Sequence, residues 1–185
     1  MVVPVMRIIA GSARSRRLVA PPGTTTRPMT DRVRESLFSS ISAWLPQGVV
    51  LDLYAGTGSM GLEALSRGAA AVTFVERDRE ALSALRTNVE AIGLGGRVIA
   101  GDVDRFLERA REPVDVAFVD PPYAVALPSL LETMKKLSPL LAHDGIAIVH
   151  RRSGEDPPES IADLVLVDER RYGSAALWRY AKEQM

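Results

Sequence analysis

The hydrophobic positions of this chain fall into two patterns that alternate through its central part. Continuous apolar runs, typical of buried strands, occur at Val49–Leu53, Ala71–Val75, Val98–Ala100, Val114–Val119 and Ile146–Val149. Between them, apolar residues recur at helical spacing in Met60–Arg67, Arg79–Ile92, Val103–Ala110 and Pro128–Leu141. Strands that are apolar throughout and separated by helices predict a parallel sheet that is covered on both faces.

The carboxyl end departs from this alternation. Apolar runs at Leu164–Val167 and Ala176–Tyr180 are separated only by a short segment, residues 170–174, which we expect to turn. Such a segment is too short for a helical crossover, so the last two strands must be antiparallel. We therefore predict an α/β fold over residues 29–185, with a Rossmann-like sheet of seven strands that ends in a reversed hairpin.

The amino end carries a basic arm, which we assign to residues 1–28. Between residues 1 and 34 there are seven arginines and one aspartate, although the net charge of the whole chain is zero. Two extended pieces, Arg7–Gly11 and Arg17–Ala20, predict a small hairpin, and Thr30 can cap the helix that follows. A basic arm beside a neutral body is expected where one face of a protein meets a polyanion.

A glycine turn follows the first central strand. Gly56, Gly58 and Gly61 form the pattern G-x-G-x-x-G between a predicted strand and a predicted helix, which is the context of a nucleotide-type cofactor site. Glu76, at the end of the next strand, can accept hydrogen bonds from ribose hydroxyls. The alternative is a tight turn with only a structural role.

The charge of Asp52, just before the glycine turn, favours S-adenosylmethionine (SAM) over a dinucleotide. A pyrophosphate would be repelled by this carboxylate, whereas the ammonium and sulfonium groups of SAM would be attracted. Asp102, after the third strand, is placed to bind the adenine amine, although both aspartates could instead cap helices. The predicted cofactor site comprises Asp52, Tyr54, Gly56, Gly58, Gly61, Glu76, Asp102 and Val103.

The second chemical motif is Asp120-Pro121-Pro122-Tyr123, at the end of another strand. The exocyclic amine of a nucleobase is a poor nucleophile, because its lone pair is delocalised into the ring. Asp120 can bond to such an amine and accept its proton, the Pro121 carbonyl is a free acceptor, and Tyr123 can stack on the base. We predict these four residues to be catalytic, with a plain proline turn as the alternative.

The chain resembles the RsmD-type guanine-N2 methyltransferases of 16S ribosomal RNA. The resemblance lies in Arg7–Gly11, in the run from Thr26 to Phe38, in Asp52–Gly68 and in Val119–Tyr123. It implies a SAM-dependent enzyme that methylates the N2 amine of a guanine in the small (30S) ribosomal subunit or its assembly intermediate. The resemblance also implies a cytoplasmic enzyme, which we expect to be a monomer.

An RNA substrate would need cationic contacts along its backbone. Our candidates for phosphate contacts lie in the arm, in the first helix, after the fifth strand and before the final turn: Arg7, Arg14, Arg16, Arg17, Arg27, Arg32, Arg151, Arg152, Arg170 and Arg171. We expect the last two pairs to lie at one edge of the sheet. The alternative for each arginine is a solvated surface position.

Other residues limit the remaining functions. The chain has no cysteine, which excludes disulfides and thiolate metal sites and fits a reducing compartment. His143 and His150 are separated in sequence and have no evident third ligand, so we predict neither a metal site nor a catalytic histidine. We expect no membrane segment.

Four competing functions remain. One is methylation of a protein glutamine, an activity that usually has Asn in place of Asp120. Asp-Pro-Pro-Tyr also suits DNA adenine-N6 or cytosine-N4 methyltransferases, but the amino-terminal residues contain no recognisable module for reading duplex DNA. An NAD-dependent oxidoreductase would need a second substrate domain, for which there is no chain. A non-catalytic RNA-binding module would tolerate loss of Asp120, whereas the whole motif is present here.

Overall fold

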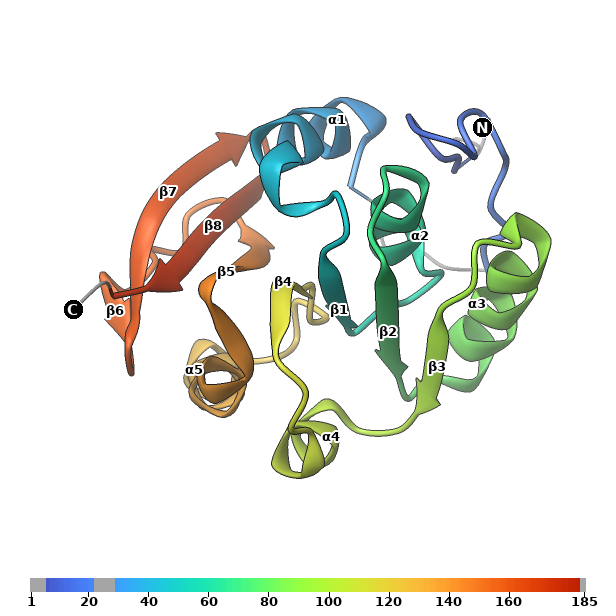
Figure 1. The fold of residues 1–185 in the computed structure, drawn as a ribbon. Coiled ribbons are helices and arrows are strands. Elements are labelled where there is room, and N and C mark those ends of the chain that lie inside the picture. The colour runs from blue at the N-terminus through green and yellow to red at the C-terminus, as the bar shows by residue number, and fades with distance from the viewer. Residues whose placement is uncertain (1–5, 22–28, 184–185) are drawn as a thin grey trace.

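The computed structural model describes residues 6–21 and 29–183. Eight strands form one sheet in the order β3-β2-β1-β4-β5-β8-β7-β6 (Figure 1). The strands are β1 (Val49–Leu53), β2 (Ala71–Glu76), β3 (Arg97–Ala100), β4 (Val114–Val119), β5 (Leu141–Arg152), β6 (Ser160–Ile161), β7 (Leu164–Tyr172) and β8 (Ala175–Lys182). The helices are α1 (Asp31–Ser40), α2 (Ser59–Ser66), α3 (Arg79–Ile92), α4 (Val103–Arg109) and α5 (Leu127–Leu137), with short 3₁₀ turns at Ser42–Trp44 and Ser138–Leu140.

Helices cover both faces of the parallel strands β1 to β5, as the apolar strand runs predict (Figure 1). On one face α1, α2 and α3 pack over alternate strand residues such as Phe74 and Phe118. On the other face α4 and α5 pack over the intervening residues, such as Leu53 and Val119. Because successive side chains of a strand point to opposite faces, each strand supplies both cores.

The prediction of seven strands is wrong by one strand. β6 contains only two residues, which pair with Leu164 and Val165 of β7. Two residues cannot establish a hydrophobic period, so the sequence pattern does not reveal such a strand. β8 pairs with β5 on one side and with β7 on the other, and both pairings are antiparallel, as predicted.

Several predicted boundaries also differ from the structure: the strand predicted over Ile146–Val149, for example, is β5 and runs from Leu141 to Arg152. Two further differences have a clear cause. The expected turn over residues 170–174 begins only after Tyr172, because β7 continues through its charged residues while it pairs with β8. The predicted helix Pro128–Leu141 ends at Leu137, and Leu141 already pairs with Val114 of β4. In both places pairing with a neighbouring strand decides the structure, and the local sequence does not encode that pairing.

The expected hairpin of the amino-terminal arm is a tight loop closed by one antiparallel bridge between Arg7 and Arg17. The loop is fastened to the last turns of α2. The buried carboxylate of Glu63 accepts hydrogen bonds from the backbone N–H groups of Ile9 (2.6 Å) and Ala10 (3.0 Å). Ser66 adds bonds to the same segment. The arm from Arg7 to Leu18 is therefore part of the folded body.

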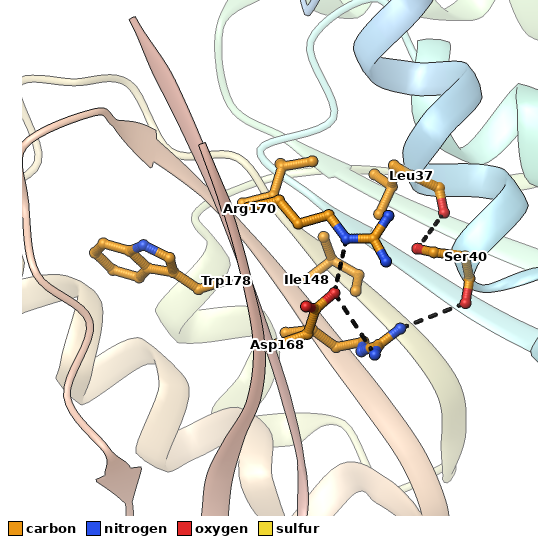
Figure 2. Close-up of a pocket in the computed structure, with 8 residues that line it drawn as sticks. Leu37, Ser40, Ile148, Asp168, Arg170 and Trp178 are labelled. Atoms are coloured by element: carbon orange, nitrogen blue, oxygen red, sulfur yellow. Dashed lines mark hydrogen bonds and ion pairs between the residues drawn. The ribbon is translucent and has the colours of Figure 1, made fainter. Parts of the chain in front are cut away.

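Helix α1 is fixed to the carboxyl-terminal hairpin by polar contacts (Figure 2). Asp168 of β7 binds Arg170 at 2.9 Å and Arg179 of β8 at 3.6 Å. Arg179 in turn donates to the carbonyl of Ser40 at the end of α1. The cavity between these residues measures about 10 Å³, which is room for roughly one water molecule and not for a cofactor.

None of the helices in the part of the chain that the structure describes is long and apolar enough to cross a membrane.

Candidate active site

The chemistry-bearing residues gather at one edge of the sheet. Strands β1 to β5 are parallel, so their carboxyl ends meet at that edge, where ligands of doubly wound sheets bind. Asp52 lies near the end of β1, Glu76 ends β2, Asp102 follows β3 and Asp120 follows β4. The sheet thus brings four of the predicted site residues to one place.

The glycine turn adopts a backbone that other residues resist. Gly56 and Gly58 have φ of +56° and +81°, in the left-handed region. Gly61, in the first turn of α2, lies so close to β2 that a Cβ atom would meet the Phe74 ring at 2.3 Å. Gly56, in contrast, has open space beside it: a Cβ atom added there would lie 4.0 Å from its nearest neighbour, a backbone oxygen. The turn is tightly packed beneath and open above.

Asp52 supports this turn from below. Its side chain is buried and accepts a hydrogen bond from the N–H of Gly61 at 2.9 Å. Burial raises the pKa of Asp52 well above its usual value, and the negative charges of Asp120 and Glu76 raise it further. The observed contact of Asp52, with an N–H group in the first turn of α2, is the one that the helix-capping alternative predicts. Asp52 is buried, so it would attract SAM only through its electric field and not through a direct contact.

Glu76 and Asp102 both have local partners. Glu76 accepts hydrogen bonds from the N–H groups of Gly56 (2.8 Å), Arg77 (2.7 Å) and Asp78 (2.8 Å), which fixes its carboxylate beside the turn. Asp102 caps α4 by accepting from the N–H of Arg105 at 3.2 Å. A carboxylate offers about four acceptor positions, so each retains capacity for a ligand.

The other two predicted cofactor residues flank the site. Tyr54 has φ of +59°, which is a strained value for a tyrosine, and its hydroxyl lies 3.5 Å from Thr133 Oγ1. Val103 is buried as the first residue of α4. Their contact with a cofactor remains a prediction.

The chemistry of this edge fits SAM. Glu76, Asp102 and Asp120 concentrate negative charge around the open turn, and a Cβ atom at Gly101 would meet nothing within 4 Å. Burial is the main cause of the raised pKa of Asp52, and the charges of Asp120 and Glu76 add to it; a cation would offset these charges, whereas a pyrophosphate would reinforce them. The donor set is therefore suited to a ligand that carries ammonium and sulfonium groups.

The raised pKa of Asp52 has a consequence for stability. The native carboxyl holds its proton more tightly than the unfolded one, whose pKa is 3.8, so its contribution to stability falls as the pH rises from that value through the raised pKa. The Asp52→Asn variant has no such group. We expect the stability difference between variant and wild type to shift in favour of the variant across this window, measured by urea unfolding at several pH values. Parallel curves would contradict this expectation.

The Asp120–Tyr123 motif lies beside the glycine turn. The Asp120 side chain is 41% exposed, and its backbone N–H lies 3.4 Å from the carbonyl of Leu53 in β1. Within the described ranges no donor bonds to the carbonyl of Pro121. Tyr123 is 39% exposed, and the guanidinium of Arg152 lies over its ring, 4.7 Å from the centroid. One face of the predicted stacking residue is therefore covered by an arginine.

The sequence interpretation missed His150. This residue of β5 lies directly beside Asp120, with its Nδ1 atom 2.7 Å from Asp120 Oδ1. The two residues are far apart in sequence, but the parallel register that pairs Val119 with Val149 makes them neighbours. Only that register could have revealed the contact.

The predicted arginines differ in burial and in their contacts. Arg151 is 2% exposed and binds Glu155 through two hydrogen bonds, so its prediction as a phosphate contact is wrong. Several others already have partners: Arg7 with Asp31, Arg16 with the last carbonyls of α3, Arg170 with Asp168, and Arg171 with Glu169 and Asp156. Exposed and without an acidic partner among the described residues are Arg14, Arg17, Arg32 and Arg152. Arg27 lies outside the described residues.

The predicted common edge of the two arginine pairs is confirmed. Arg151 of β5 and Arg171 of β7 both pair with Ala176 of β8, one on each side. β5 and β7 run in the same direction, so Arg152 and Arg171 lie at the edge that carries Asp120.

Residues 6–181 match the family described as Conserved hypothetical protein 95. The chain belongs to this family. One relative, Ribosomal RNA small subunit methyltransferase D (RsmD) of Escherichia coli K12, is 36% identical over 96% of this chain and 90% of its own length. Another, "Putative rRNA methyltransferase YlbH" of Bacillus subtilis, is 36% identical over 96% of this chain and 99% of its own length.

A solved structure supports the same conclusion. "Putative methyltransferase yhhF" of E. coli superposes with a TM-score of 0.85 at 37% identity, covering 96% of this chain and 97% of that one. The resemblance inferred from the motifs is therefore confirmed, as is the Rossmann-like fold. This member of the RsmD family is a methyltransferase.

Proposed function

We propose that the protein transfers the methyl group of SAM to the exocyclic N2 amine of a guanine in 16S ribosomal RNA. The observation that carries this proposal is the half-exposed carboxylate of Asp120 beside the glycine turn, in a chain similar to RsmD over nearly its whole length. An acceptor next to an open cofactor turn is what methylation of an amine requires. The substrate would be the small ribosomal subunit or an assembly intermediate, and the protein would bind it in the cytoplasm as a monomer.

Different residues at this edge of the sheet bind different parts of SAM. Gly56 leaves room for SAM above the turn, Gly58 is packed against Leu85 beneath it, and Asp52 holds the turn against α2. Glu76 accepts hydrogen bonds from ribose hydroxyls, and Asp102 accepts one from the adenine amine. Bound there, SAM supplies an electrophilic methyl group.

The Asp120–Tyr123 motif prepares the nucleophile. Asp120 accepts a hydrogen bond from the guanine amine, which aims the nitrogen lone pair and then takes up the proton. The Pro121 carbonyl accepts the second amine hydrogen on a stiff backbone. Tyr123 stacks on the unstacked base with the ring face that Arg152 leaves free, while Arg152 covers the opposite face of the ring. Most of the acceleration comes from holding two reactants in place.

The exposed arginines without acidic partners are the phosphate contacts of this proposal. Arg14 and Arg17 lie on the arm, Arg32 on α1 and Arg152 beside Tyr123. Each contact adds a salt-dependent contribution to affinity without reading the sequence of the RNA. Specificity then comes from the shape of the ribosomal particle and its exposed loop.

The test supplies methyl-labelled SAM with undermethylated small subunits, naked 16S RNA or duplex DNA, and identifies the labelled nucleoside after digestion. N2-methylguanosine in ribosomal RNA is the expected product. Label found only in DNA as N6-methyladenine or N4-methylcytosine would replace the RNA assignment by the DNA alternative. Absence of label in every substrate would overturn the proposal.

A further inference from the structure

A buried imidazole lies behind the reactive carboxylate. The side chain of His150 is 7% exposed, and its Nδ1 atom is 2.7 Å from Oδ1 of Asp120, whose own side chain is 41% exposed. No described residue donates a hydrogen bond to Oδ2 of Asp120. One carboxylate oxygen is therefore engaged by the protein, and the other is free.

The direction of this hydrogen bond follows from its chemistry. An ionised carboxylate only accepts hydrogen bonds, so Nδ1 of His150 carries the proton and donates it. The other ring nitrogen, Nε2, is buried and has no hydrogen-bond partner among the described residues. An imidazole that relays protons needs an acceptor on its far side. Because no described residue offers Nε2 such an acceptor, we assign His150 no part in relaying the proton of the substrate.

The position of His150 is unfavourable for stability. Burial of a polar ring nitrogen without a partner costs free energy, and an apolar side chain could fill the same space. Tyr123 packs against the ring edge-on, with the centroids 5.9 Å apart. The imidazole thus touches both the carboxylate and the aromatic residue of the motif. Within residues 6–21 and 29–183, the one polar contact of the ring is with Asp120, so that contact is the evident reason for a polar residue here.

We propose that His150 is a positioning residue for the methyl transfer. It holds Oδ1 of Asp120, so that Oδ2 points to the place of the guanine amine, and it packs Tyr123 from the edge. Asp120 is half exposed and, without this bond, would rotate about its side-chain torsions and bind water. This inference rests on the proposed function, because the reaction that it serves is the transfer to an amine.

Three variants of His150 test the proposal. His150→Leu removes the donor and keeps most of the volume. His150→Asn places an amide N–H near the position of Nδ1, whereas His150→Gln places it near that of Nε2, where it cannot reach Asp120. We expect kcat to fall about tenfold to a hundredfold for the Leu and Gln variants, the size of a hydrogen bond to a charged group. The Asn variant should recover most of this loss, with KM for SAM and for RNA unchanged in all three.

A double-mutant cycle separates positioning from packing. In an Asp120→Ala background, His150→Leu should cost almost nothing further in kcat, because the side chain that it orients is gone. Thermal unfolding and SAM binding of each variant control for folding. In wild-type protein labelled with ¹⁵N-histidine, NMR should show a protonated Nδ1 whose signal shifts in the Asp120→Asn variant.

The possible failures are distinguishable. Wild-type activity with an unchanged kcat for His150→Leu overturns the inference alone. The same conclusion follows if Asn restores no more activity than Gln at position 150, or if the Leu variant costs as much in the Asp120→Ala background as in wild type. A wild-type protein that labels no RNA overturns the proposed function, and the role of His150 in it falls as well.

Discussion

Replacement of Asp120 by alanine should lower kcat for methyl transfer about a hundredfold to ten-thousandfold, the range for loss of a positioned proton acceptor. The side chain is half exposed and its hydrogen-bond partner is His150, so its removal leaves the core and the glycine turn in place. The affinity for SAM should fall far less than kcat, because Asp52, Glu76 and Asp102 remain at the turn. Single-turnover kinetics with undermethylated small subunits and equilibrium binding of SAM measure the two quantities separately.

Two further variants sharpen this experiment. Asp120→Asn keeps the shape of the side chain and one acceptor oxygen but cannot take up the proton. A fall in kcat as large as that of the alanine variant would assign Asp120 to proton transfer. A smaller fall in kcat would assign it to orientation of the amine. Asp156→Ala is the matched control, because this aspartate lies in the loop after β5, is 90% exposed and, among the described residues, bonds only to Arg171 of β7. A wild-type kcat for Asp120→Ala would contradict the assignment of the site.

The sequence predicts those parts of the fold that local patterns specify. The predicted bounds of α3, Arg79 to Ile92, agree with the structure, since Asp78 caps one end and Gly93 adopts the left-handed conformation at the other. The parallel strands were recognisable because burial on both faces makes them apolar throughout. Partner strands set the remaining boundaries. β7 continues through Tyr172 because β8 pairs with it, and no residue in that stretch signals the extension.

The same distinction applies to the site. The carboxyl-end rule for parallel strands was sufficient to bring Asp52, Glu76, Asp102 and Asp120 together. The rule could not distinguish a residue that contacts the ligand from one that stabilises the protein backbone. Asp52 is of the second kind, because it is buried and accepts a hydrogen bond from the N–H of Gly61. The rule also could not show that His150 touches Asp120, because that contact depends on the register of β4 against β5.

The sequence also does not reveal the role of Glu63. A glutamate in a helix is usually exposed, yet Glu63 of α2 is fully buried beneath the amino-terminal arm. The first residue of α2 follows the glycine turn, while its last turns hold the arm through Glu63 and Ser66. One short helix therefore connects the predicted cofactor turn to the predicted RNA-binding arm.

Replacement of Glu63 by alanine should lower the free energy of unfolding by about 3–5 kcal/mol, because it leaves buried donors without their charged partner. The carboxylate accepts from the N–H groups of Ile9 and Ala10 and from Arg67 at 2.6 Å. All three donors lose their acceptor at once. For a chain of this length the corresponding fall in Tm is on the order of 10 °C. Urea unfolding monitored by circular dichroism measures the change.

A local readout distinguishes release of the arm from general weakening. Trypsin cleaves after arginine, and Arg14 and Arg17 lie in the loop that Glu63 holds. Under native conditions the Glu63→Ala protein should be cleaved there much faster than wild type, and its RNA affinity should fall while its SAM affinity is retained. Glu90→Ala, at an exposed position of α3, is the control for loss of a helical glutamate. If both variants lose the same stability and resist trypsin equally, the arm is held by its apolar contacts, Ile8 and Leu18 above all, and the carboxylate is dispensable.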